Sequence, residues 1–560
     1  MTRIAFFALL CATMQTSSAQ FSIDTTADTG DADPGNGICA DSDGNCSLRA
    51  AIQEANALAG ADEIVLPPGT FRLALEGDDD SAGAGDLDVF DELEIIGSGA
   101  GQTVLGQDAA GERIFDVFNQ PTQAVALTLR DLTIRDGDVA GNGGAIRNQG
   151  LVSAVRVHFL ANAATGDGGA IQNNVGGDVT LDSCYFEGNV AASDGAGGSG
   201  GAINNNAGAI AKGDGGDVIA GTGTVTTRNS DFLMNRASAG GAINSSRNNR
   251  IFVEGGLFTQ NSAAPFDGGV ANLNSSNALM RVEGARMSSN TAERNGGAIN
   301  NNSGSVLEVF RSEISDNMAG RDGGGLNSNS SRDSYLLVAS SAVTGNSAGR
   351  DGGGVHTFGD SRVDNSTLSQ NTAVRNGGGF KAGGVANVLS SSTVTGNSAG
   401  DDGGGVYAAA CDVVGLKNNA IAENGGGDCG FRESNQASAP EIFVSLGHNL
   451  DGDDTCQLTQ LTDLPATDPL LDPLAANGAP GLSRLPQMGS PLLDAGDATL
   501  CPARDQRSVT RGGAAGPCDI GSIERADDPT QVFADSFERP VAAMPVEITA
   551  PGQTQACIND

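Results

Sequence analysis

The sequence predicts an all-β fold, a right-handed parallel β-helix with a short N-terminal capping helix and a small Pro-rich C-terminal module. Two short phrases alternate along much of the chain: Gly-Gly-Ala-Ile-Asn, and an apolar residue followed three positions later by Asn. Most copies of each phrase lie 25 to 29 residues apart, and a fixed period of this length indicates a solenoid. Short β-branched runs between the Gly and Asn residues, without helical spacing, favour coils built from strands.

The repeats predict how one coil stacks on the next. With one repeat per coil, equivalent residues lie over each other at about the 4.8 Å spacing of neighbouring strands. The apolar residues then form an inward column, and the Gly pairs allow sharp turns where a Cβ would clash. The Asn that closes the first phrase predicts a ladder of amide hydrogen bonds. Its expected members are Asn173, Asn204, Asn244, Asn272, Asn300 and Asn327.

Composition excludes several classes of protein. The net charge of −37 argues against nucleic acid and against an anionic membrane surface as partners, because both attract basic proteins. Gly is abundant, at 82 of 560 residues, but it follows no Gly-X-Y period, which excludes collagen. The mature chain has no apolar stretch long enough for a transmembrane helix. We expect a monomer.

Residues 1–19 are typical of an export signal: Arg3 precedes a short apolar core, and small residues end at Ala19. Export makes disulfides plausible for the cysteines that follow. Proximity in the sequence predicts the pairs Cys39–Cys46, Cys501–Cys518, and either Cys411–Cys429 or Cys429–Cys456. Cys184 stands alone in the repeats and is expected to be a small buried apolar residue.

The remaining chain divides into four parts: a cap (20–62), the repeats (63–430), a Pro-rich module (431–524) and a tail (525–560). The cap contains a predicted helix over 47–56. Ser47 is a favourable N-cap, and the apolar residues after it fall on one helical face. A short amphipathic helix in this position would cover the open end of the solenoid.

Three stretches resemble known families. Residues 46–56 resemble the N-terminal module of bacterial exported CSLREA-domain proteins, with Ala50 in place of the Glu that would complete a capping box. The paired phrases resemble the passenger repeats of polymorphic outer-membrane proteins, which are β-helical surface adhesins. Motifs at 445–450, 468–471, 489–497, 505–507 and 518–521 resemble the choice-of-anchor Q module that ends bacterial β-helix surface proteins. These resemblances imply an exported bacterial protein.

The residue pair before each Gly run predicts a charged stripe along one edge of the solenoid. Stacking would place guanidinium groups beside carboxylates or amides; the residues concerned are Arg294, Arg321, Asp322, Arg350, Asp351, Arg375 and Asp402. Such a stripe can be an ion-pair ladder that links coils and keeps the edge solvated. It is also a candidate surface for a glycan or a cation, or for catalysis.

Two further candidate sites stand out. His356, Lys381 and Tyr407 replace the ladder Asn in three successive coils, where they are either tolerated turn variants or, with Phe358, a surface for sugar stacking. The loop 76–91 is expected to be exposed and acidic, and Ca²⁺ is the cation that it would bind; its proposed ligands are Asp78, Asp80 and Asp86.

The sequence leaves three functions open: a binding protein on the cell surface, an enzyme, and a structural component. We expect an exported, secreted or cell-surface, non-enzymatic β-helix protein, adhesin-like, that contacts a polysaccharide or a host-surface glycan. One alternative is a polysaccharide lyase or glycosidase of the pectin-lyase-like fold, which needs a base near an acidic sugar or two carboxylates flanking the bond. The other is a passive structural component of the surface. The regular stripe gives no unique residues, so no catalytic residue is assigned.

Overall fold

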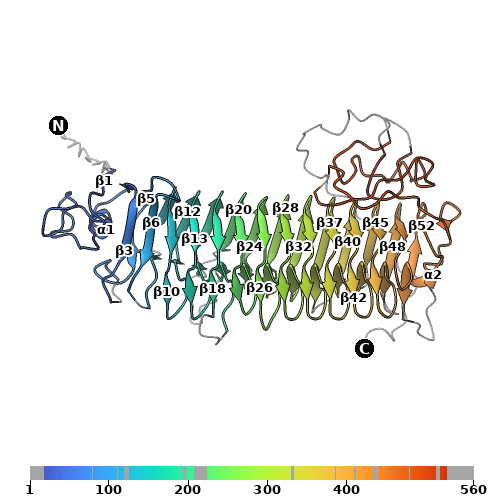
Figure 1. Cartoon of the computed structure of the whole chain (residues 1–560), viewed down its shortest axis with the longest axis horizontal. Helices are drawn as coiled ribbons and strands as arrows, with labels where there is room; N and C mark the ends of the chain where they lie inside the picture. The colour runs from blue at the N-terminus through green and yellow to red at the C-terminus, as the bar shows by residue number, and fades with distance from the viewer. Residues whose placement is uncertain are drawn as a thin grey trace, which may run out of the picture.

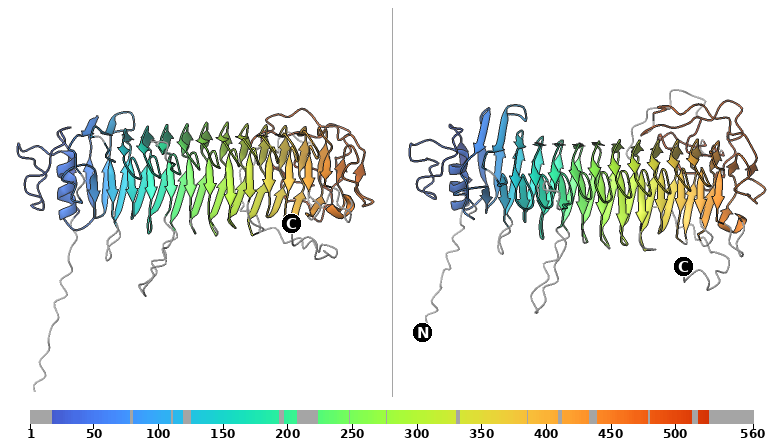
Figure 2. Two further views of the ribbon diagram at one scale, coloured as in Figure 1. Left: turned by 90° about the horizontal axis from the view of Figure 1, so that it is seen from below. Right: turned by 60° about the horizontal axis from the view of Figure 1, so that its bottom comes forward.

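A computed structural model describes residues 18–77, 80–109, 111–118, 125–192, 197–206, 223–246, 248–275, 277–329, 333–384, 386–408, 412–432, 439–478, 480–512 and 517–525. They form one elongated rod of stacked coils, with a helix at one end and an irregular module folded over one side near the other (Figures 1 and 2). Strands of successive coils pair in parallel. The fold is the right-handed parallel β-helix that the sequence predicts.

Within the described ranges, four sheets run along the rod, and each complete coil passes through sheets A, B, D and C in that order. Sheet A has 15 strands. They are β1 (Gln20–Ser22), β2 (Asp62–Val65), β5 (Leu93–Ile96), β8 (Ala126–Arg130), β12 (Leu151–Val155), β16 (Asp178–Asp182), β20 (Thr224–Arg228), β24 (Arg250–Glu254), β28 (Leu279–Glu283), β32 (Val306–Phe310), β36 (Tyr335–Ala339), β40 (Asp360–Asp364), β44 (Asn387–Ser390), β48 (Val414–Lys417) and β51 (Phe443–Ser445).

Sheet B also has 15 strands and follows sheet A in each coil. They are β3 (Gly69–Leu73), β6 (Thr103–Gln107), β9 (Thr133–Arg135), β13 (His158–Leu160), β17 (Tyr185–Glu187), β21 (Asp231–Leu233), β25 (Leu257–Thr259), β29 (Arg286–Ser288), β33 (Glu313–Ser315), β37 (Ala342–Thr344), β41 (Thr367–Ser369), β45 (Thr393–Thr395), β49 (Ala420–Ala422), β52 (Leu450–Asp451) and β53 (Leu464–Pro465).

Sheet D is a row of ten two-residue strands at the turn after sheet B. They are β10 (Asp138–Val139), β14 (Ala163–Ala164), β18 (Val190–Ala191), β22 (Arg236–Ala237), β26 (Ser262–Ala263), β30 (Thr291–Ala292), β34 (Met318–Ala319), β38 (Ser347–Ala348), β42 (Thr372–Ala373) and β46 (Ser398–Ala399).

Sheet C has 13 strands and carries the apolar residue of the first phrase. They are β4 (Leu87–Val89), β7 (Phe115–Val117), β11 (Ile146–Asn148), β15 (Ile171–Asn173), β19 (Ile203–Asn205), β23 (Ile243–Ser245), β27 (Ala271–Leu273), β31 (Ile299–Asn302), β35 (Leu326–Asn329), β39 (Val355–Thr357), β43 (Phe380–Ala382), β47 (Val406–Ala408) and β50 (Cys429–Phe431).

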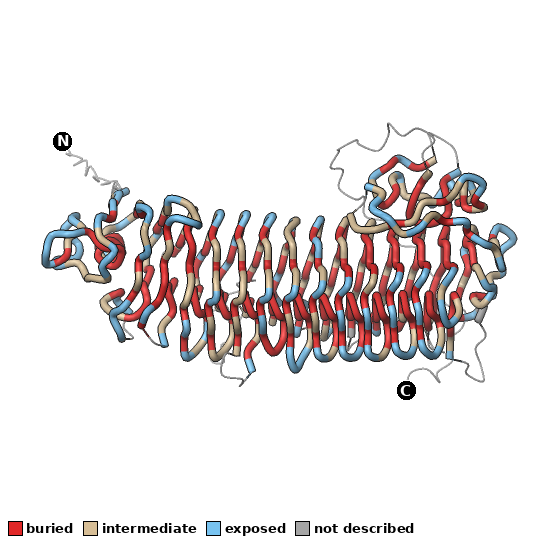
Figure 3. Tube along the Cα trace, viewed as in Figure 1, coloured by how far each residue is buried: buried red, intermediate tan, exposed pale blue. Residues whose placement is uncertain are grey.

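Buried residues recur in coil after coil along the rod (Figure 3), and their apolar side chains form one continuous core. Ile171, Ile203 and Ile243 lie in register on neighbouring strands of sheet C and are fully buried. On sheet B, four phenylalanines from the second phrase stack with ring centroids 4.5 to 4.7 Å apart. Each coil therefore repeats the contacts of the coil before it, Ile on Ile in sheet C and Phe on Phe in sheet B, as the repeated sequence phrases predict.

Ladders of amides hold the coils together, and among the described residues two long ones stand beside a short run in which Asn148 donates to Asn173 and Asn173 to Asn205. The first lies on sheet C and joins Asn204, Asn244, Asn272, Asn300 and Asn327, each donating to the preceding coil at 2.6 to 3.0 Å. Placing Asn173 in it is wrong, since Gln172 is the residue in register and accepts from Asn204 at 3.0 Å. The second ladder, which we did not predict, is formed by the Asn of the second phrase. Its ten members are Asn162, Asn189, Asn235, Asn261, Asn290, Asn317, Asn346, Asn371, Asn397 and Asn424.

The Gly pairs are required by close backbone contact. Gly296 has a φ of 66°, in the left-handed region that favours glycine. At Gly297 a Cβ would lie 2.1 Å from the carbonyl oxygen of Gly324 in the next coil. Any side chain there would force the two coils apart, so this part of the phrase is scaffold.

The predicted N-terminal helix is present as α1 (Leu48–Ala57), and it covers the first coils. Ser47 is its N-cap and accepts a hydrogen bond from the backbone N–H of Ala50 at 3.0 Å. Arg49, which the sequence did not single out, is fully buried and forms an ion pair with Asp28 at 2.6 Å. Among the described residues, no helix is long and apolar enough to cross a membrane.

The coils continue past residue 430, where the sequence pattern ends, through β51 and β52 to β53 (Leu464–Pro465), with α2 (Ala439–Ile442) before them. The disulfides Cys39–Cys46 and Cys501–Cys518 form as predicted. Cys429 pairs with Cys456 and not with Cys411, which lies outside the described residues. Cys184 is buried and free, as expected. These bonds indicate an oxidising environment.

Residues after Pro465 fold back over the outer face of sheet B, above β37 to β49 (Figure 1). The outward-facing position on this sheet is charged in the two coils before the module, at Arg286 and Glu313. In the next four coils it is small: Ala342, Thr367, Thr393 and Ala420. Thr367 accordingly donates to Gln506 at 2.6 Å, and Thr393 accepts from the backbone N–H of Ser522 at 3.0 Å. The small residues give the module room to contact the strands.

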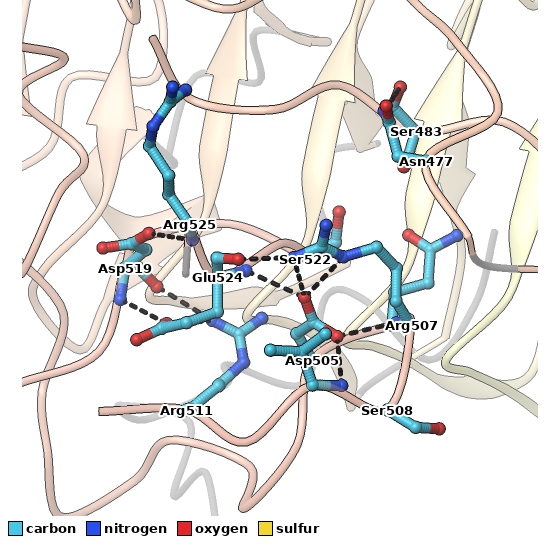
Figure 4. A network of polar contacts seen from close by, with 12 residues as sticks. Asn477, Ser483, Asp505, Arg507, Ser508, Arg511, Asp519, Ser522, Glu524 and Arg525 are labelled. Atoms are coloured by element: carbon cyan, nitrogen blue, oxygen red, sulfur yellow. Dashed lines mark hydrogen bonds and ion pairs between the residues drawn. The ribbon is translucent and has the colours of Figure 1, made fainter. Parts of the chain in front are cut away.

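A buried polar network holds the module in shape (Figure 4). Asp505 accepts hydrogen bonds from the backbone N–H groups of Arg507, Val509 and Glu524. Arg511 is almost completely buried. It donates to the carbonyl oxygens of Asp519 and Gly521 and, on the solenoid, to Oδ1 of Asn365 in the turn after β40 at 2.9 Å. The 505–507 and 518–521 motifs therefore have a structural role.

Candidate functional site

Four arginines lie in a row along one edge of the rod, one in each of four successive coils. We call Arg294, Arg321, Arg350 and Arg375 the arginine row. Its register is fixed by backbone hydrogen bonds, because the N–H of each arginine after Arg294 donates to the carbonyl oxygen of the preceding arginine at 2.7 or 2.8 Å. The row precedes the Gly turns that lead into sheet C, so the scaffold sets both its direction and its spacing.

Half of the arginine row forms ion pairs with buried carboxylates. Arg350 holds Asp322 of the preceding coil with two nitrogens, and Arg375 holds Asp351 at 2.7 Å. Both aspartates are buried in the Gly turns, while the arginines stay partly exposed. The predicted pairing between stacked coils is therefore present here, and it leaves these two carboxylates committed to arginine.

The other half of the row has a different environment. Among the described residues, no carboxylate lies within 4.0 Å of the guanidinium of Arg294 or Arg321. Burial raises the pKa of nearby Asp267, and the charges of the two arginines oppose that rise. Phe266 precedes the row in the same backbone line, with Arg294 N–H donating to its carbonyl oxygen at 3.2 Å, and it is 45% exposed. The exposed edge thus offers an aromatic ring followed by guanidinium groups.

At the C-terminal end of the amide ladder of sheet C, other residue types replace Asn. His356, Lys381 and Tyr407 lie in register after Asn327, on β39, β43 and β47. His356 Nδ1 lies 2.8 Å from Asn327 Oδ1, and Lys381 Nζ lies 3.1 Å from His356 Nε2. Because Asn327 already donates its amide to Asn300, the histidine must carry its proton on Nδ1 and accept at Nε2.

Electrostatics keep the histidine neutral. Burial, followed by the neighbouring Lys381 charge, holds the pKa of His356 well below its usual value. Burial also lowers the pKa of Lys381, and the charge of Asp351 partly offsets this. The Lys381 ammonium lies 5.6 Å from the centre of the Phe358 ring, which is 51% exposed. Lys381 and Phe358 thus bring a cation and an aromatic ring together beside the row.

Two sequence-predicted residues have other roles. Asp402 accepts hydrogen bonds from the backbone N–H groups of Gly403 and Phe431, and burial raises its pKa. Tyr407 is largely buried next to Lys381. Neither extends the exposed face, and the arginine row ends where Asp401 follows Arg375 in the backbone line.

The loop expected to bind calcium is only partly exposed, which corrects the prediction of an open acidic loop. Asp86 is buried and forms an ion pair with Arg113 at 2.6 Å. Asp80 is exposed, and Asp78 lies outside the described residues. The Arg113 partner lies 27 residues from Asp86 in sequence, so no local pattern revealed this pairing.

Comparisons with known proteins add little to this geometry. No family model matches the chain, and no curated protein is significantly similar in sequence. Two solved structures are similar in part: the A-module of the Azotobacter vinelandii mannuronan C-5 epimerase AlgE6 (13% identity, 80% of this chain and 100% of that chain, TM-score 0.23) and pectate lyase Pel9A (13%, 91% and 97%, 0.26). At these values neither match bears on the chemistry, and the fold rests on the strand register.

Proposed function

We propose that this protein is an exported, non-enzymatic β-helix protein that binds an acidic polysaccharide along the arginine row. The observation that carries the proposal is the row itself: four guanidinium groups, one per coil, on a chain of net charge −37. Arg350 and Arg375 neutralise buried aspartates, but among the described residues Arg294 and Arg321 have no carboxylate within 4.0 Å that would account for them. A row of cations at strand spacing matches a ligand whose own negative charges recur along one axis.

The chemistry of the row favours carboxylated sugars. Guanidinium groups bind carboxylates with two parallel hydrogen bonds, and Arg294 and Arg321 are the members without a carboxylate within 4.0 Å among the described residues. Exposed rings such as Phe266 and Phe358 can pack against the apolar faces of sugar rings. A polymer of uronic acids supplies both kinds of contact.

Other observations support display outside the cell. The three disulfides in the described part of the chain suit an oxidising compartment. The export signal over 1–19 falls mostly outside the described residues, and with the CSLREA-like and choice-of-anchor-like motifs it supports a secreted or surface-attached protein. Export, surface attachment and a row of arginines together support adhesion to a glycan-coated surface.

Binding to polygalacturonate, measured by calorimetry at low salt, tests the proposal. We expect the double variant Arg294→Ala/Arg321→Ala to bind about fivefold more weakly, since each exposed charge contact contributes roughly 0.2–1 kcal/mol. The matched control Arg228→Ala/Arg250→Ala removes two arginines from sheet A and should bind like the wild type. Equal binding to a neutral dextran, or equal loss in both variants, would contradict the proposal.

A second candidate function is removal of a proton from the bound sugar. Lys381, with a pKa lowered by burial and an ammonium next to a neutral His356, is the observation that favours it. Incubation with pectate and alginate, with absorbance followed for new double bonds, separates the two functions. Turnover that disappears in Lys381→Met would establish the enzyme; binding without turnover supports the display function.

A further inference from the structure

The ten-membered Asn ladder ends on a carboxylate. Each Asn donates its side-chain amide to the Asn of the next coil, and Asn424 at the end donates to Asp428 Oδ1 at 2.9 Å. The other carboxylate oxygen, Oδ2, points toward the chain at Gly452, where a Cβ would lie 2.8 Å from it. Asp428 therefore presents a free oxygen to the turn that follows β52.

That turn brings two more carboxylates to the same place. One oxygen each from Asp428, Asp451 and Asp453 lie within 4.8 Å of one another. Asp428 and Asp451 are 1% and 0% exposed, whereas Asp453 is exposed. The chain on both sides is tied together by the Cys429–Cys456 disulfide. The three carboxylates thus form a fixed cluster with one side open to solvent.

Two oxygens of this cluster are buried without a hydrogen-bond partner in the described part of the chain. They are Asp428 Oδ2 and Asp451 Oδ1. Asp451 uses its other oxygen to accept from the backbone N–H of Cys456 at 2.9 Å. The N–H of Gly452, close enough to lower the pKa of Asp428, donates its hydrogen bond to the Ile421 carbonyl oxygen. Unpaired buried carboxylate oxygens are costly, so this cluster needs a cation or a proton.

No basic side chain supplies that charge, since these three aspartates form no ion pair among the described residues. Burial raises the pKa of Asp428 to about 6 and that of Asp451 to about 7, and the neighbouring aspartate charges add to both rises. A divalent ion would stabilise these buried, mutually repelling carboxylates, because it neutralises two negative charges and can be coordinated by one oxygen from each of the three aspartates.

We propose that Asp428, Asp451 and Asp453 bind one Ca²⁺ ion that closes the C-terminal end of the solenoid. Hard oxygen ligands favour Ca²⁺, and the exposed Asp453 leaves positions for water in its coordination shell. The ion would link β50, which follows Asp428, to β52 and the turn after it, and so fix the last coils on which the Asn ladder ends. The site is separate from the arginine row and does not depend on the proposed function.

Calorimetry of the full chain with CaCl₂, after treatment with a chelator, tests the site. We expect one bound Ca²⁺ per chain and a higher Tm with calcium than with chelator. Asp451→Asn should weaken binding by at least about tenfold, because it removes a charged ligand. The control Asp454→Asn makes the same charge change at an exposed residue of the same turn and should bind Ca²⁺ like the wild type.

Unfolding temperatures measured in chelator show whether Asp451→Asn loses Ca²⁺ because a ligand is missing or because the variant is misfolded. Without calcium, Asp451→Asn should unfold at the same or a higher temperature than the wild type, because an amide next to Asp428 removes a buried repulsion. A folded wild type that takes up no Ca²⁺ would overturn the proposal, as would an Asp451→Asn variant that binds as tightly as the wild type.

Discussion

Replacing Asn317 by alanine is expected to lower the free energy of unfolding by about 3–5 kcal/mol, because at least two buried polar groups lose their partners at roughly 1–3 kcal/mol each. The Asn317 amide donates to the carbonyl oxygen of Met287 and to Asn346, and its Oδ1 accepts from both the backbone and the side chain of Asn290. No water can reach these groups in a site with 1% exposure.

Chemical denaturation and hydrogen exchange measure this effect. Since each coil is stabilised mainly by its neighbours, protection should fall first in the coils next to residue 317, which lies in the middle of the array. Met318→Ala is the matched control, because it truncates the adjacent residue, which is 54% exposed. A loss in Asn317→Ala no larger than in this control would show that the ladder does not stabilise the rod.

Replacing Arg511 by leucine is expected to cost about 3–5 kcal/mol and to release the C-terminal module, because removing one member of a buried polar network leaves its partners unsatisfied. Arg511 joins the carbonyl oxygens of Asp519 and Gly521 to Asn365 on the solenoid and lies 3.6 Å from Glu524. The coils beneath should stay folded, since their strand pairing does not include the module.

Limited proteolysis, with far-UV circular dichroism as a check on the β content, detects this release. Cleavage between residues 466 and 525 should become rapid in Arg511→Leu while the circular dichroism signal is largely kept. The control Arg504→Leu removes a guanidinium from the same module where it donates to the Ser508 carbonyl oxygen at the surface. Equal resistance to protease in both variants would contradict the docking role of Arg511.

The sequence predicted the features that depend on local repetition. Repeated sequence units stack on one another in register. The period, the Gly positions and the recurring apolar residues therefore predicted the β-helix and its columns of Ile and Phe. The capping helix followed from Ser47 and the apolar spacing after it. The Asn173 error has a local cause as well: a shift of one position along a strand moves a side chain to the other face.

Features that depend on contacts between distant segments could not be predicted. The module docks through pairs such as Gln506 with Thr367, which lie 139 residues apart. Cys429 had one candidate partner on each side in the sequence, and the path of the last coil brings Cys456 to it. The acidic cluster joins Asp428 to Asp451 through a turn outside the repeat pattern. The arginine row was visible in the sequence, but which members have a free guanidinium edge depends on side-chain packing.

Ligand length tests whether the arginine row binds an acidic polysaccharide along the axis of the rod. Oligogalacturonates of increasing length should bind the wild type with rising affinity until they span the row, which covers four coils at about 4.8 Å per coil, and should then reach a plateau. In Arg294→Ala/Arg321→Ala the rise should be largely lost. Affinity that is independent of length, or a rise that persists unchanged in the variant, would show that the polysaccharide does not bind along the arginine row.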